Sequence, residues 1–136
     1  MAQHNFTDND FKIAVSGLID AIWGKGVIAA NRPENINDDV IQVVEDVVNS
    51  IKTCSKRMLA VDVTYNFLYT APGSLREMMV GIIADMVANG IKGAHDPLTT
   101  YKGWLNVIRS NRQYRSCINT AALYHRSRLE MAFLGI

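Results

Sequence analysis

The chain has 136 residues, of which 49% are hydrophobic and 20% are charged, and its formal net charge is +1. This size and composition suit one folded domain with its own hydrophobic core and exclude an intrinsically disordered chain. Because the net charge is close to zero, bulk electrostatics indicates no particular class of charged partner.

The first predicted helix contains the segment "FKIAVSGLIDAIW", residues 11–23. At 100° per residue its large apolar side chains fall on one side of the helix. Thr7 or Asp8 is expected to cap the start, and Gly24 or Gly26 the end. The apolar face comprises Phe11, Val15, Leu18, Ile19, Ile22 and Trp23.

The second predicted helix covers residues 38–59, with Asn37 as its N-cap. Its valines favour strand by propensity, but their spacing is helical, and periodicity decides the assignment. Asp38 and Asp39 suit the positive end of the helix dipole. The expected inner face comprises Val40, Val44, Val47, Val48, Ile51, Cys54 and Met58.

Residues 63–69 are ambiguous between strand and helix, and helix is favoured because a lone strand would have nothing to pair with. Ser74 and Glu77 then form a capping-box pattern before a helix over residues 75–90. That helix is apolar on most sides, which predicts a central, buried position. Its small residues, Gly81, Ala84 and Ala88, are expected to let a neighbouring helix approach closely.

Two further helices are predicted, one after the Asp96–Pro97 capping pattern and one over residues 112–134. The inner face of the last helix should comprise Tyr114, Ile118, Ala121, His125, Leu129 and Ala132. The sequence therefore predicts an all-α protein, a bundle of five to six helices in which residues 1–136 form a single helical domain.

Positive charge gathers near the C-terminus. Residues 109–128 hold five arginines and no carboxylate, and residues 92–136 carry a net charge of +5 against −4 for residues 1–91. On the last helix Arg112, Arg115, Asn119 and Arg126 lie within about 60° of one another and form a basic stripe. Arg109 and Arg128 point elsewhere.

Three interpretations of this stripe stand side by side. The arginines can form a solvated surface, with their stems over the edge of the core. They can pair with acids such as Asp38, Asp39 and Asp46, within the chain or across a subunit contact. They can contact phosphates of DNA or RNA. The residues for this nucleic-acid alternative are Arg109, Arg112, Arg115, Asn119, Arg126 and Arg128.

The C-terminal segment is unusually apolar for a chain end, because it contains Met131, Phe133, Leu134 and Ile136. We expect this tail, and in particular Phe133 and Leu134, to dock on its own bundle or to fill a groove of a neighbour.

Catalysis has little support in the sequence. His125 is expected to be a hydrogen-bonded core histidine rather than a base, and no metal-binding or cofactor-binding motif is present. Cys54 and Cys117 belong to no paired motif, so they are interpreted as two separate small apolar side chains in a reducing compartment. The polar N-terminus is no signal peptide, and no apolar run is long enough to span a membrane.

These patterns predict a soluble cytoplasmic protein without catalytic, metal or cofactor sites. The favoured function is a non-enzymatic helical interaction protein that self-associates or serves as a small subunit of a larger assembly. Its partner would be itself or another protein. The alternative is a nucleic-acid-binding accessory protein that uses the C-terminal arginines.

Overall fold

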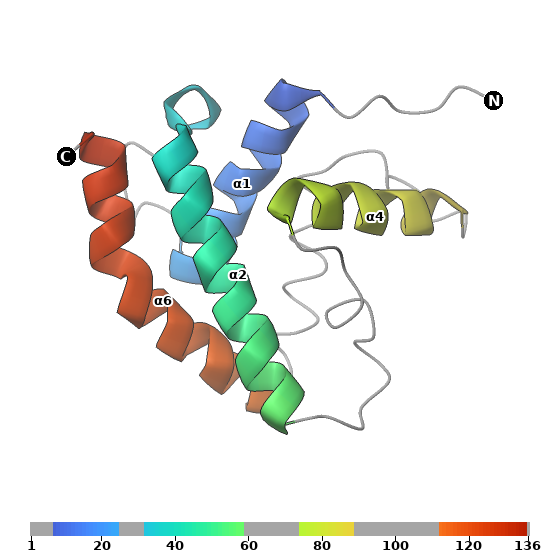
Figure 1. The fold of residues 1–136 in the computed structure, drawn as a ribbon, viewed down its shortest axis with the longest axis vertical. Helices are drawn as coiled ribbons and strands as arrows, with labels where there is room; N and C mark the ends of the chain where they lie inside the picture. Colours follow the sequence, from blue (N-terminus) through green and yellow to red (C-terminus); the bar gives the residue numbers. More distant parts are fainter. Residues whose placement is uncertain (1–6, 25–31, 59–73, 89–111, 136) are drawn as a thin grey trace.

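The computed structural model describes residues 7–24, 32–58, 74–88 and 112–135, and Figure 1 shows their arrangement. These residues form four α-helices and one short 3-10 helix and contain no strand, so the protein is all-α. The elements are α1 (Asp8–Trp23), η1 (Pro33–Asn35), α2 (Asp38–Met58), α4 (Leu75–Ala88) and α6 (Arg112–Leu134). The helices predicted over residues 63–69 and after Pro97 lie outside the described residues.

The helix ends follow local capping chemistry. Thr7 caps α1: its hydroxyl accepts a hydrogen bond from the Asp10 backbone at 3.1 Å, and the Asp10 carboxylate accepts one from the Thr7 backbone at 3.2 Å. Gly24, with a φ of 93°, ends the helix in a conformation that a side chain would disfavour. Asn37 caps α2 by accepting a hydrogen bond from the Val40 backbone at 2.9 Å. The predicted starts of both helices are confirmed.

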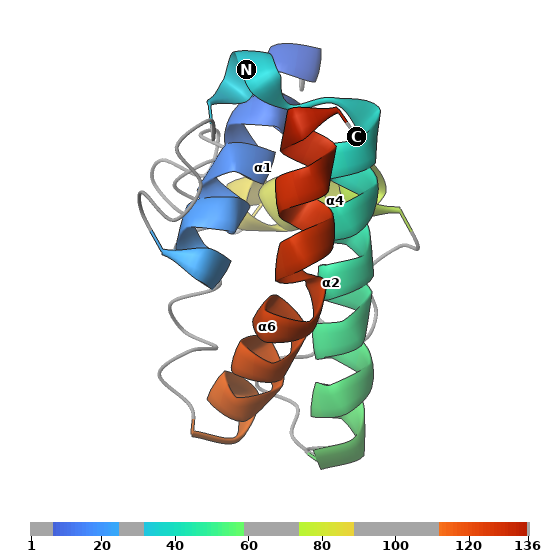
Figure 2. The same ribbon diagram turned by 90° about the vertical axis from the view of Figure 1, so that its left-hand side faces the viewer.

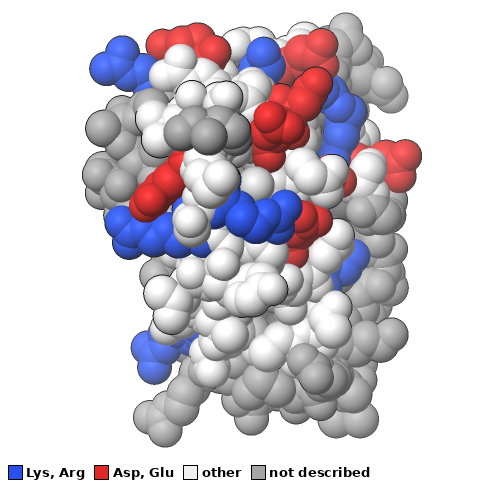
Figure 3. All heavy atoms as spheres, turned by 60° about the vertical axis from the view of Figure 1, so that its left-hand side comes forward, with Lys and Arg blue, Asp and Glu red and all other residues white. Residues whose placement is uncertain are grey.

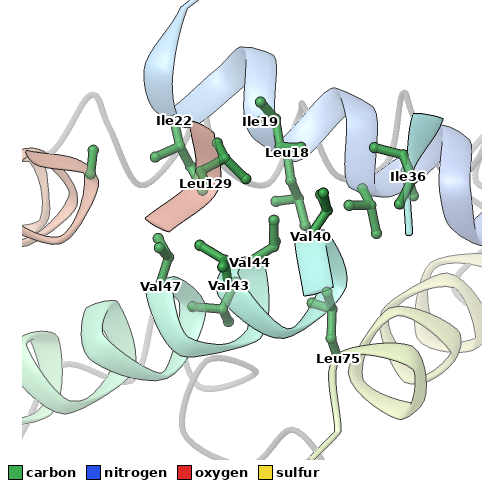
Figure 4. Close-up of a cluster of buried hydrophobic side chains, with 14 of the residues drawn as sticks. Leu18, Ile19, Ile22, Ile36, Val40, Val43, Val44, Val47, Leu75 and Leu129 are labelled. Atoms are coloured by element: carbon green, nitrogen blue, oxygen red, sulfur yellow. The ribbon is translucent and has the colours of Figure 1, made fainter. Parts of the chain in front are cut away.

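The core lies between α1, α2 and α6, and α2 and α6 run side by side in the two perpendicular views of Figures 1 and 2. Figure 4 shows Leu129 of α6 reaching between α1 and α2, toward Ile22 and the valines of α2. The predicted inner faces are confirmed wherever their side chains are described. The core contains Phe11, Ala14, Val15, Leu18, Ile19, Ile22, Ile36, Val40, Val43, Val44, Val47, Val48, Ile51, Leu75, Met79, Ile118, Ala121, Ala122, Leu129 and Ala132.

Two side chains fasten α6 to the other helices. The Trp23 indole N–H donates a 2.8 Å hydrogen bond to the Ala122 carbonyl, which links α1 to α6. The Asn37 side-chain amide donates a 3.0 Å hydrogen bond to the Ala132 carbonyl in the last turn of α6, which also accepts from the Gly135 backbone N–H at 3.3 Å. The start of α2 therefore lies beside the end of α6.

The predicted central position of α4 is wrong. Leu75 and Met79 are buried, but Ala84 and Ala88 are exposed and Gly81 is half-buried, so the small residues do not receive a close neighbour. Figure 1 shows α4 lying beside α1 and α2 and extending away from them, with its first turns nearest to them. A helix that is apolar all round becomes buried on every side only if the fold places a neighbour on each side.

The start of α4 is held by both neighbouring helices. The Leu75 backbone N–H donates to the Glu45 carboxylate of α2 at 3.0 Å. Arg76 forms a 2.8 Å ion pair with Asp8 of α1, and its guanidinium lies 4.3 Å from the centre of the Phe11 ring. The two N-terminal turns of α4 are therefore its anchored part.

The interpretation of the cysteines as separate apolar side chains is also wrong. Cys54 of α2 and Cys117 of α6 form a disulfide, with their Cα atoms 5.7 Å apart. The two residues are 63 positions apart in the sequence, and only the packing of α2 against α6 brings them together. Their pairing removes the cysteine argument for a reducing compartment.

Within the described part of the chain, no helix combines the length and the apolar character that crossing a membrane would require.

Candidate functional site

A polar cluster occupies the contact between α2 and α6. Arg128 donates to the Asp46 carboxylate at 2.8 Å through one nitrogen and to His125 Nδ1 at 3.0 Å through another. On the other side of the ring, His125 Nε2 lies 3.4 Å from the Ser50 hydroxyl oxygen. His125 is buried, with 5% of the residue's surface exposed. The prediction of a hydrogen-bonded core histidine is therefore confirmed.

The donors in this cluster determine the state of the ring. Arginine can only donate, so His125 Nδ1 must accept and carries no proton. The Ser50 hydroxyl donates its hydrogen to the Asp46 carbonyl at 2.8 Å. His125 Nε2 therefore carries the ring proton and points it at the Ser50 oxygen, which is the neutral tautomer.

Serine, histidine and aspartate occur together here, but their arrangement differs from a catalytic triad. In a triad the histidine accepts the serine proton and the carboxylate orients the opposite ring nitrogen. Here Ser50 gives its proton to a backbone carbonyl, and Arg128 stands between His125 and Asp46. The cluster joins α2 to α6 and offers no activated nucleophile. Among the described residues, no group of three or more His, Cys, Asp or Glu side chains could hold a metal ion.

The buried imidazole makes stability depend on pH. Burial lowers the pKa of His125 below its usual value of 6.5, the charge of Arg128 lowers it further, and Asp46 opposes them in part. Between the folded-state pKa and 6.5 the unfolded chain binds a proton that the folded protein does not bind. The contribution of His125 to stability is therefore complete above about pH 6.5 and is lost as the pH falls toward the folded-state pKa.

We expect the free energy of unfolding to fall more steeply with acidification in the parent protein than in a His125→Gln variant. Urea titrations at about pH 7.5 and about pH 5.5 would measure, for each protein, how far the free energy of unfolding falls between the two pH values. The comparison isolates His125 because all other titrating groups are common to the two proteins. Equal slopes would show that the imidazole titrates alike in the folded and unfolded chains.

The outer face of α6 carries large apolar side chains that contact water. Leu123 is 79% exposed, Tyr124 78%, Leu134 72% and Met131 46%. On a helical wheel they lie within about 100° of one another, opposite the buried face. The exposed residues between them are uncharged: Ser116, Thr120 and Ser127. We call these seven residues the outer face.

The C-terminal tail does not behave as one unit. Phe133 is half-buried and packs against the protein's own core, whereas Leu134 is exposed. Consecutive residues of a helix are 100° apart, so a continuing helix directs them to different sides. Phe133 therefore docks on the protein's own bundle, and Leu134 does not. Ile136 lies outside the described residues.

An open depression of about 310 Å³ lies beside the outer face, between α2 and α6. It shares Met131 with that face, and its other lining residues are Asp39, Gln42, Val43, Arg128 and Ala132.

The predicted arginine stripe is partly neutralised by neighbouring acids. Arg126 forms a 3.0 Å ion pair with Glu130 on the same helix. Asp46, a predicted target of the stripe, pairs instead with Arg128. Arg115 and Asn119 are exposed, and Arg115 forms no ion pair within the described part of the chain. The helix begins at Arg112, whose side chain lies outside the described set, as does the whole of Arg109.

Asp38 and Asp39 are exposed at the start of α2 and form no ion pair within the described ranges. Asp39 lines the depression with Ala132, which is 17 positions from Arg115 and therefore about 25 Å from it along α6. No arginine side chain spans that distance, so Arg115 cannot pair with these two acids within its own chain.

Charge of both signs covers the side of the molecule on which α6 lies. Figure 3 shows the blue atoms of Lys and Arg next to the red atoms of Asp and Glu over the upper part of this surface, and fewer charged atoms among the described residues below. This mixed surface differs from the uninterrupted basic patch that contacts to a nucleic-acid backbone require.

The periodicity of the last helix correctly predicted that His125 faces inward, but other residues of the site were not predicted from the sequence. Ser50 and Gln42 gave no signal, because a polar residue on an amphipathic helix looks the same whether it faces solvent or another helix. The exposed positions of Leu123 and Tyr124 could have been read from the same wheel, since they lie opposite the buried face.

In comparisons with known proteins, no protein-family model, no curated protein and no solved structure matches this chain, so inferences about its function come from its own residues and geometry.

Proposed function

We propose that the protein is a non-enzymatic α-helical interaction protein, which binds a second copy of itself or another protein through the outer face of α6. The observation that carries the proposal is the exposure of Leu123, Tyr124 and Leu134, each more than 70% accessible. Large apolar side chains gathered on one helix face leave apolar surface in water, and a docked partner removes it. Tyrosine and methionine are also among the residues enriched at protein interfaces.

The nucleic-acid alternative receives less support. Two of its six residues, Arg126 and Arg128, already form ion pairs with Glu130 and Asp46. Contact with a phosphate would have to compete with those carboxylates. The exposed apolar side chains also have no role in contacts to a phosphate backbone, which depend on positive charge.

The disulfide bears on where this function operates. In an oxidising compartment the Cys54–Cys117 bond persists and holds α2 to α6. In the cytoplasm both residues would be thiols, and the same helix pair would depend on packing and on the His125 cluster. A cytoplasmic location therefore requires that the helix pair function without its crosslink.

A photoreactive amino acid at position 123, introduced in the cells that produce the protein, tests the proposal. We expect covalent adducts with protein, either a second copy or another chain, because position 123 holds the most exposed large hydrophobic side chain of the outer face. The matched control carries the same amino acid at position 49, an exposed site on α2. Equal yields of protein adducts at the two positions, or none at position 123, would refute an interaction role for this face.

A further inference from the structure

We propose that the partner of the outer face is a second copy of this chain, with the two α6 helices packed antiparallel about a two-fold axis near Leu123. This inference rests on the proposed function and specifies the partner and its orientation. In such a pair the same surface serves both protomers, so its charges must complement themselves when the helix is turned end for end.

The charges along one edge of the outer face meet that condition. Arg115 and Glu130 lie on this edge, within about 60° of each other on the helical wheel. They are equally far, about 11 Å along the axis, from the point between Ala122 and Leu123. A two-fold axis through that point places Arg115 of each protomer opposite Glu130 of the other. A parallel two-fold pair would instead set this edge against the opposite edge of the second helix, so Arg115 and Glu130 would not meet.

The same axis brings two polar side chains together. Asn119 and Arg126 are also equidistant from it, on the edge that carries Arg115 and Glu130, and each would lie opposite the other residue in the second copy. The Asn119 side-chain carbonyl can accept from a guanidinium. Glu130 already accepts from Arg126 in its own chain, and a carboxylate has sites for further donors.

The apolar centre agrees with this axis. Leu123, the most exposed of the large hydrophobic residues in the described part of the chain, lies next to the two-fold axis and would contact its own copy. Tyr124 follows it on the side of the depression. Protein interfaces usually have apolar and aromatic residues at the centre and charged residues at the rim.

Asp38 and Asp39 lie outside this arrangement. Asp39 borders the opposite edge of the outer face, where it shares the depression with Met131, and Asp38 precedes it in the chain. In an antiparallel two-fold pair, each edge of the outer face packs beside the same edge of the second copy. The acid that complements Arg115 across the contact is therefore Glu130, in place of the aspartates of α2.

The size of the face limits the affinity. With 23 residues α6 is about 35 Å long, and at a width of about 10 Å its outer face covers about 350 Å² in projection. A standard interface buries about 800 Å² of accessible surface on each partner. The pair is therefore expected to be a reversible dimer that dissociates on dilution.

Sedimentation velocity of the purified, oxidised protein over a range of concentrations tests the inference. We expect a monomer–dimer equilibrium that weakens with added salt. Arg115→Glu should weaken dimerisation about five- to tenfold at low salt, because two attractive contacts become repulsive. The double variant Arg115→Glu with Glu130→Arg should recover part of the loss, since the opposed charges attract again. Leu123→Glu should abolish the dimer.

The matched control is Arg32→Glu, the same charge reversal at an exposed arginine before η1, which should leave the equilibrium unchanged. Far-ultraviolet circular dichroism of every variant shows whether the helices are retained. A dimer that Arg115→Glu and Leu123→Glu leave intact would overturn the inference. So would a protein that stays monomeric while position 123 crosslinks to a different chain, and that result would leave the proposed function standing.

Discussion

Replacing Cys54 and Cys117 together with serine is expected to lower the free energy of unfolding by about 2–5 kcal/mol. The disulfide joins residues 63 positions apart, and a crosslink of that span restricts the unfolded chain by about 4 kcal/mol in the loop-entropy relation. Along α2, the disulfide is the third link to α6: Asn37 contacts Ala132, Ser50 contacts His125, and Cys54 is bonded to Cys117. Urea unfolding in oxidising buffer measures the change.

A reducing agent supplies the control for this experiment. The reductant should destabilise the parent protein toward the value of the double serine variant and leave that variant unaffected. A double variant as stable as the oxidised parent would show that the crosslink restricts neither state, in which case packing alone holds α2 against α6.

The second large effect is expected at Leu129. Its side chain is fully buried between α1 and α2 (Figure 4), so Leu129→Ala leaves a cavity in the core. We expect a loss of about 2–5 kcal/mol in the free energy of unfolding, with the range set by how far the surrounding side chains collapse. Thermal and urea unfolding would both report it.

Leu123→Ala is the matched control, because it makes the same substitution on the same helix at a position that is 79% exposed. Its effect on the stability of the monomer should stay within about 0.5 kcal/mol. Measurement at concentrations below dimerisation separates folding from association. Similar losses for the two variants would contradict the inward and outward assignments of α6.

The proposed roles of α6 divide between its two sides. The inner side contributes Leu129 to the core and His125 to the contact with α2, and substitutions there should act on folding. The outer side contributes Leu123 and Arg115, and substitutions there should act on association. This division lets stability and assembly be tested by separate variants of one helix.

The sequence could predict about half of the site. The positions of His125 and of the exposed arginines follow from the helical period, which is a local property. The partners of these residues did not follow: Asp46 pairs with Arg128 and not with the stripe, and Glu130 neutralises Arg126. Within residues 109–128 the arginines have no neighbouring acid, because Glu130 lies just beyond this segment and Asp46 is on another helix. These pairings could therefore not be predicted from the segment itself.

The sequence by itself determined the helices that the structure describes and the inward faces of α1, α2 and α6. Thr7, Asn37 and the period of the apolar residues act within one or two turns, so their effect can be read without knowing the fold.

Only the tertiary structure decided which helices adjoin. It paired Cys54 with Cys117, joined Arg128 of α6 to Asp46 of α2, and turned Ala84 and Ala88 toward solvent. The physical reason is that periodicity defines the face a helix can bury, whereas the neighbour that covers this face depends on the packing of segments far apart in the sequence.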